Sequence, residues 1–262
     1  MSYPTDLTDG QWRLINSHVP PPKRGGRPAK YPRREIVNAV LYQTRNGGTW
    51  RSLPHDFPPY RIVFHYFRLW QRDGTWTRIH DALRTRVRES VGKKPKPSAG
   101  ILDSQSVKTT EHGGPKGFDA GKKINGRKRH VVVDTLGLIW ALVITPASVQ
   151  DAEGAKLALG EFRKQVKFPK ILWADSAYRA VVGWAWVQWT WTIEVVSGTP
   201  GQKGFVVQPK RWIVERTFGW LNRSRRLAKD YERTTESAQA FGQIAMINLM
   251  VRRLRKPKEF AF

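Results

Sequence analysis

The 262-residue chain has no cysteine and no long apolar segment. Without cysteine it cannot form disulfides, thiolate metal sites or iron–sulfur clusters, and zinc fingers are excluded as a means of reading DNA. No segment reaches the roughly 18 uncharged apolar residues of a membrane-spanning helix, and the first residues do not resemble a signal peptide. We therefore expect a cytoplasmic protein that has no membrane partner.

Acidic residues are also scarce relative to basic ones. The chain has 21 Asp and Glu against 46 Lys and Arg, which gives a formal net charge of +25. A charge of this size indicates a polyanionic partner. Residues 1–97 hold 19 basic and 7 acidic side chains and the rest of the chain holds 27 and 14, so both parts should contact that partner. The hydrophobic content of 40% is too high for a disordered basic tail.

The composition changes at residues 92–98, where glycine, proline and lysine end a helical pattern. We predict a helical domain over residues 1–91, a linker over 92–98 and a second domain over 99–262. Capping residues and apolar spacing predict helices in the first domain at about 9–19, 33–46, 60–72 and 75–90.

The third of these helices carries a basic face, made of Arg61, His65, Arg68 and Arg72. Because a major groove admits one such helix, we interpret it as the recognition helix of a helix-turn-helix-like unit. An ordinary solvated helix face is an equal alternative. Arg24 and Arg27 lie in an extended cationic segment that fits a narrow minor groove, with a solvated linker as the alternative.

The second domain is predicted to be α/β. Strand-like runs are followed along the chain by alternating strands and helices, a pattern typical of a mixed sheet with helices on its faces. The strands are expected at about 101–107, 129–135, 138–145, 170–175 and 192–196, and the helices at 152–164, 178–189, 211–226 and 235–255. The second and third strands should form a hairpin about Leu136 and Gly137.

Four acidic residues interrupt the apolar strand-like runs, namely Asp103, Asp134, Asp175 and Glu194. A carboxylate at the end of a buried strand costs desolvation energy unless it is paired or binds a metal, so each is a candidate functional residue. A capping or turn acid is the alternative, and for Asp134 we favour the turn.

Two such aspartates in a basic protein suggest metal-dependent phosphodiester chemistry, because Mg²⁺ is held by carboxylates together with phosphate oxygens. Glu215 is the candidate third acid, since it follows Arg211 and precedes Arg216, the kind of cations that phosphates need. The alternative is that Glu215 only pairs with these arginines on a helix face.

Several separated motifs resemble one known family. The ordered set ILDSQSVKT, GRKRHVVVDTLGLIWALVITPASVQDAEGA, WADSAYR and RWIVERTFGWLNRSRRLAKDYE is similar to bacterial insertion-sequence transposases of the DDE type, in the insertion-sequence-five-like family. LTDGQW, GGRP, NAVLYQTRNGGTWRSLPHDFP and FRLWQRDGTW resemble the amino-terminal DNA-binding region of that family. The resemblance extends from about residue 7 to 255.

The resemblance implies an RNase H-like domain in which Asp103, Asp175 and Glu215 bind two divalent metal ions, Mg²⁺ or alternatively Mn²⁺. It also implies a reaction: the protein binds the terminal inverted repeats of an insertion sequence, hydrolyses a phosphodiester and directs the freed 3′-hydroxyl at target DNA. Joining two ends requires a homodimer or a higher homo-oligomer on double-stranded DNA, in the bacterial cytoplasm at the nucleoid.

The family pattern around the glutamate is Tyr, two residues, Arg, three residues, Glu, six residues and Lys. Arg211 and Glu215 match it, whereas Gln208 and Asn222 stand at the Tyr and Lys positions. The predicted DNA contacts in the second domain are Arg211, Asn222, Arg223, Arg226, Lys128 and His130. For Lys128 and His130 a solvated hairpin face is the alternative. A DNA-binding derivative without catalysis and a nuclease that cuts without joining are the alternative functions.

Overall fold

The computed structural model describes residues 3–22, 25, 28–196 and 210–255, and the chain forms two compact units. The first contains the residues up to Gly92, the segment Arg223–Ala228 and the residues from Ala240 onward. The second contains Lys93–Asn222 and Lys229–Gln239. The chain therefore divides close to the predicted linker, but it returns twice to the first unit, from segments that the sequence assigned to the second domain.

The first unit is helical. The predicted helices are α1 (Asp9–Ile15), α2 (Arg33–Asn46), α3 (Tyr60–Arg72) and α4 (Thr75–Ser90), and 3₁₀ turns follow α1 at Asn16–His18 and α2 at Trp50–Ser52. The predicted capping box at Thr8 and Gln11 is present. Gly47 ends α2 in the left-handed conformation at φ 78°, where a Cβ would press on the backbone of Arg225.

Late segments of the chain complete the core of this first unit. They are the 3₁₀ turn Arg225–Leu227 and the larger part of α8 (Thr235–Arg255). Phe241 of α8 stacks on Phe67 of α3 with ring centroids 4.6 Å apart, and both side chains are fully buried. The Arg226 guanidinium lies over the Phe241 ring and donates a hydrogen bond of 2.6 Å to the Gly48 carbonyl. The last helix is therefore part of the packing of the N-terminal helices.

The second unit is built on a mixed six-stranded sheet. Its strands are β1 (Ala99–Lys108), β2 (Gly117–Asp119), β3 (Ile124–Val133), β4 (Ile139–Pro146), β5 (Ile171–Ala174) and β6 (Ile193–Val195). The order is β2-β3-β1-β5-β6, with β4 also paired to β3. Strands β1 to β4 pair antiparallel, whereas β1, β5 and β6 pair parallel. The prediction of a mixed sheet is confirmed.

The hairpin between β3 and β4 turns where the sequence predicted. Asp134 is fully buried and accepts hydrogen bonds from the backbone N–H groups of Leu136 and Leu138 and from the Trp140 indole. Gly137 takes φ 77°, and a Cβ there would meet Thr217. Asp134 is therefore a turn acid, as favoured.

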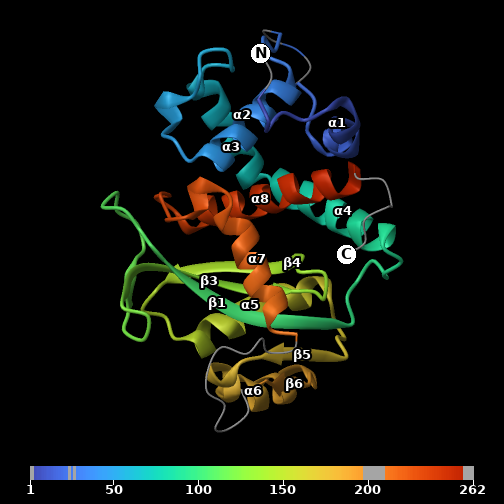
Figure 1. Cartoon of the computed structure of the whole chain (residues 1–262), viewed down its shortest axis with the longest axis vertical. Helices are drawn as coiled ribbons and strands as arrows, with labels where there is room; N and C mark the ends of the chain where they lie inside the picture. Colours follow the sequence, from blue (N-terminus) through green and yellow to red (C-terminus); the bar gives the residue numbers. More distant parts are fainter. Residues whose placement is uncertain (1–2, 23–24, 26–27, 197–209, 256–262) are drawn as a thin grey trace. The chain divides into compact units, whose positions relative to one another are not determined.

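Helices cover both faces of the sheet. Figure 1 shows α5 (Asp151–Gln165) behind the strands and α7 (Trp212–Asn222) in front of them, while α6 (Arg179–Trp189) lies at the β5–β6 end. The expected helix over 211–226 is shorter, because Ser224 is extended and a separate 3₁₀ turn follows. None of the helices in the described parts of the chain is long and apolar enough to span a membrane.

Candidate active site

Asp103 and Asp175 lie side by side because of the strand register. Strands β1 and β5 run parallel, with Ile101 opposite Trp173. Continuing this register by two residues places Asp103 level with Asp175, just beyond the end of β5. Asp175 then caps the 3₁₀ turn Ser176–Tyr178 by accepting a hydrogen bond of 2.8 Å from the Ala177 N–H. The two carboxylates therefore meet where β5 ends, beside the middle of the longer strand β1.

Arg211 lies against both carboxylates. One of its terminal nitrogens is 3.4 Å from Asp175 Oδ2 and 4.0 Å from Asp103 Oδ2. Arg211 directly precedes α7, which packs against β1. The three side chains are between 15% and 27% exposed, so the cluster is sheltered but open to solvent. A guanidinium held against two aspartates is the main chemical feature of this cluster.

The charge balance of the cluster favours a further cation. Burial, followed by the negative charge of Asp175, raises the pKa of Asp103 to about 6, although the Ser104 N–H, Arg211 and Lys122 act in the opposite direction. Burial and the charge of Asp103 also raise the pKa of the Tyr178 phenol. A divalent ion would remove this electrostatic cost, and two carboxylates are ligands that Mg²⁺ prefers. The two aspartates therefore fit such an ion.

Glu215 does not join these two aspartates here. It lies on the exposed side of α7, one turn after Arg211. Among the described residues no three His, Cys, Asp or Glu side chains are close enough to share a metal ion. Glu215 is also not an ion-pair partner of its neighbours, because Arg211 faces the aspartates and Arg216 lies over the rings of Trp212 and Trp220. Its role as the third acid remains a prediction.

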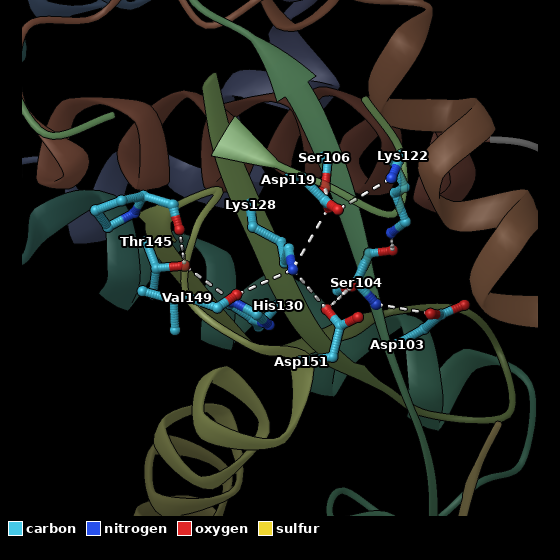
Figure 2. A network of polar contacts seen from close by, with 11 residues as sticks. Asp103, Ser104, Ser106, Asp119, Lys122, Lys128, His130, Thr145, Val149 and Asp151 are labelled. Carbon is cyan, nitrogen blue, oxygen red and sulfur yellow. Dashed lines mark hydrogen bonds and ion pairs between the residues drawn. The ribbon is translucent and has the colours of Figure 1, made fainter. Parts of the chain in front are cut away.

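A polar network lies under Asp103, on the opposite face of β1 (Figure 2). Ser104 donates a hydrogen bond of 2.7 Å to Asp151, and Ser106 donates one of 2.6 Å to Asp119. The Lys128 ammonium lies between these carboxylates, 3.1 Å from Asp151 and 3.5 Å from Asp119. The Ser104 N–H connects this network to Asp103 by donating a hydrogen bond of 2.7 Å to its Oδ1. This network holds the middle of β1 against β3 and α5.

The expectation that Lys128 and His130 contact DNA is therefore corrected. Lys128 is 4% exposed and His130 is fully buried. His130 is close to Thr145, with 3.0 Å between Nε2 and Oγ1, and its ring packs on Gly154 of α5. Burial lowers the pKa of His130 to about 4, so the ring is neutral at physiological pH. Both faces of β3 are covered, which removes these side chains from the surface.

The predicted recognition face is exposed. Arg61, His65, Arg68 and Arg72 project from α3 and line a shallow groove with Phe64 and Leu69, while the opposite stripe is buried at Val63, Phe67 and Trp70. Among the other predicted DNA contacts, Asn222 and Arg223 are exposed. Arg226 is only 6% exposed and is held by Gly48 and Phe241, so it is a core residue instead. Arg24, Arg27 and Gln208 lie outside the described residues.

Sequence reasoning missed one residue at this site, Lys122. It lies in the turn between β2 and β3, and its ammonium donates a hydrogen bond of 3.3 Å to the Ser104 carbonyl beside Asp103 (Figure 2). The sequence signal was limited to a turn-like Asp-Ala-Gly followed by two lysines. Such a turn does not indicate which strand lies next to it.

Comparison with known families agrees with this geometry. A family model described as "Transposase DDE domain" matches residues 94–250, and one described as "Putative transposase of IS4/5 family" matches residues 7–80. The chain belongs to the DDE transposase family. The predicted family resemblance and the RNase H-like fold class are thereby confirmed. DDE transposases act on DNA, and their catalytic domains generally use divalent metal ions.

Two of three relatives of this transposase carry names that refer to the insertion element IS402. It is 30% identical over 113 residues to the "Insertion element IS402 uncharacterized 16.2 kDa protein" of Burkholderia cepacia, covering 41% of this chain and 76% of that one. It is 27% identical over 135 residues to the "Putative transposase for insertion sequence element IS402" of the same organism, covering 49% and 63% of the two chains. It is 36% identical over 64 residues to the "Uncharacterized protein y4sN" of Sinorhizobium fredii (strain NBRC 101917 / NGR234), covering 24% and 51%.

Proposed function

We propose that this transposase binds the terminal inverted repeats of an insertion sequence, cuts the DNA ends by metal-dependent hydrolysis and joins the freed 3′-hydroxyl ends to target DNA. The observation that carries the proposal is the pair Asp103 and Asp175, which share the Arg211 guanidinium at 4.0 and 3.4 Å. Two carboxylates with a raised pKa in one of them are suited to holding hard divalent cations against a phosphodiester.

Asp103 and Asp175 would hold the divalent ions, with Glu215 as the third acid. When bound, two such ions activate the attacking oxygen and stabilise the leaving oxygen. In hydrolysis the P–O3′ bond breaks as the water oxygen bonds to phosphorus, and the released 3′ oxygen takes a proton. In joining, that 3′-hydroxyl replaces water and a P–O3′ bond of the target strand breaks. Arg211 is placed to bind a non-bridging phosphate oxygen of the cut strand.

End recognition is assigned to the first unit. The exposed basic face of α3 would enter the major groove of the inverted repeat, with Arg side chains on guanine edges and phosphates. Two ends must be held together for joining, so the working complex is a homodimer or a higher homo-oligomer on DNA. The transposase would act in the bacterial cytoplasm, at the nucleoid.

The test is a cleavage and strand-transfer assay with Mg²⁺ or Mn²⁺ on DNA that carries the flanking repeats. Asp103→Asn, Asp175→Asn and Glu215→Gln should each abolish both reactions while DNA binding persists. Glu153→Gln is the matched control, because Glu153 is an exposed acid, 61% accessible, whose ion pair is with Lys156 on α5.

Each alternative function has its own outcome in the same assay. Cleavage without joining by the wild type would identify a nuclease. Binding without cleavage would identify a DNA-binding derivative. Full activity of Glu215→Gln would remove Glu215 from the proposed set and leave the two aspartates as the site.

A further inference from the structure

Lys122 occupies an unusual position relative to the two aspartates. Strand β1 pairs with β5 only up to Ile101, so its next residues have an open edge where β5 has ended. At this edge both main-chain groups of Ser104 are used by side chains. Its N–H donates to Asp103 and its carbonyl accepts from Lys122 Nζ. The Lys122 ammonium and the Asp103 carboxylate are therefore bound to the same residue.

The turn that carries Lys122 is held in place by contacts to Asp119. Asp119 accepts a hydrogen bond of 3.0 Å from the Lys122 N–H, and its other oxygen accepts from Ser106 of β1. The buried Lys128 ammonium lies 3.5 Å from that second oxygen. The next residue, Lys123, takes φ 53°, a left-handed conformation that is uncommon for a residue other than glycine. The turn is thus specified by several contacts, and these direct the Lys122 side chain toward the edge of β1 (Figure 2).

The Lys122 ammonium is not in a close ion pair with a described carboxylate, unlike the Arg211 guanidinium, although its charge acts on Asp103, Asp119 and Asp151. Arg211 is already shared by two carboxylates. Within the described residues the Lys122 ammonium lies within 4.0 Å of no carboxylate, and the residue is exposed. An ammonium has three donors, and the Ser104 carbonyl uses one of them. The two remaining N–H donors suit a ligand that has several acceptor oxygens and a negative charge.

We propose that Lys122 binds a backbone phosphate of the DNA strand that enters the Asp103–Asp175 site, on the side of Asp103. The inference rests on the proposed function, and it assigns the β2–β3 turn to the DNA-binding surface of the catalytic unit. Lys128 and His130, which the sequence suggested for such a role, are buried, and Lys122 takes the position that they were expected to fill.

The experiment measures binding without divalent cations, so that it does not depend on cleavage. Full-length wild type, Lys122→Met and Lys123→Met are titrated against duplexes that carry the inverted repeat. Lys123→Met is the matched control, because it removes the same charge from the neighbouring exposed position. Lys122→Met should weaken binding about tenfold, the effect expected for one hydrogen bond to a charged group, and lower the salt slope by about one. Lys123→Met should change affinity less than about twofold.

A direct contact is then separated from a structural role by neutralising phosphates one at a time as methylphosphonates. Neutralising one phosphate near the cleavage site should lower the DNA affinity of the wild type and of Lys123→Met about tenfold. The same substitution in the DNA should not lower the affinity of Lys122→Met any further. Lys122→Arg should restore the sensitivity. The proposal is overturned if Lys122→Met keeps the wild-type sensitivity at every phosphate, or if the two methionine variants behave alike. A wild type that binds but does not cleave in Mg²⁺ would refute the proposed reaction and leave this result standing.

Discussion

Asp103→Asn is expected to stabilise this transposase at neutral pH although it removes a residue that the proposed reaction needs. The pKa of Asp103 rises from 3.8 to about 6, with burial as the largest cause. The folded state therefore binds this proton more tightly than the unfolded state. The resulting stability is complete below about pH 3.8 and is lost as the pH rises through about 6.

The size of the effect follows from the shift. One pKa unit corresponds to about 1.4 kcal/mol, so an ionised Asp103 costs the folded state about 3 kcal/mol above pH 6. Asparagine keeps the oxygen that accepts the 2.7 Å hydrogen bond from the Ser104 N–H. It gives up the 4.0 Å contact with Arg211 and the attraction of the Lys122 charge, and it also removes the repulsion from Asp175. We expect the variant to be about 2–3 kcal/mol more stable near pH 7.5 and equal to wild type near pH 4.

The assay is urea unfolding in EDTA at several pH values, followed by tryptophan fluorescence. Glu215→Gln serves as the comparison, since it removes an exposed carboxylate and should leave stability within about 0.5 kcal/mol of wild type. An Asp103→Asn variant that is no more stable than wild type at neutral pH would refute the reasoning. So would an advantage that stays constant down to pH 4.

Three further predictions concern packing, a buried ion pair and DNA affinity. Gly154→Ala should destabilise the protein by about 1–3 kcal/mol, because its Cβ would overlap the buried His130 ring. Gly160→Ala on the same helix has open space around it and should stabilise the protein by about 0.5–1 kcal/mol. Thermal unfolding of the two variants compares their stabilities. Arg127→Met should lower the free energy of unfolding in urea by about 3–5 kcal/mol, because the buried Asp230 carboxylate, 1% exposed, loses the Arg127 guanidinium that lies 3.1 Å away. The double variant with Asp230→Asn should regain part of this stability. Replacing Arg61, Arg68 and Arg72 together with alanine should reduce the salt slope of DNA binding by about 2–3, while Arg13→Ala on the exposed side of α1 should not; equal slopes would remove α3 from the interface.

Local signals in the sequence were sufficient for most of the helices. The Thr8 capping box and the Gly47 left-handed end depend on residues within one turn of each other, so the start of α1 and the end of α2 could be predicted. The end of α1 was predicted too late, because a 3₁₀ turn replaces the α-helix after Ile15. The two aspartates were also found locally, because each ends a strand-like apolar run. Their adjacency, however, comes from the parallel pairing of β1 with β5, which residues about 70 positions apart establish.

The errors arose where distant segments cover a strand or a helix. Residues 127–130 form a run of four basic side chains and look like a solvated hairpin face. All four are buried, because β3 is covered on both faces and alternation therefore gives no signal. Arg226 was misplaced for the same reason, since the Phe241 ring that covers it lies on another helix. Lys122 could not be assigned to the site from the sequence, because the sequence of a turn does not specify which strand lies next to it.

The path of α8 has a consequence for damaged copies of the gene. The first 92 residues contain the predicted recognition helix, yet Phe67 on that helix needs Phe241 to complete its packing. A copy that stops before codon 240 would encode the whole recognition helix without the aromatic partner that buries its inner side. Such a fragment is expected to fold poorly and to be degraded, so it would not occupy the ends of intact elements. We therefore expect that truncated copies of the gene do not inhibit the transposases that intact copies encode.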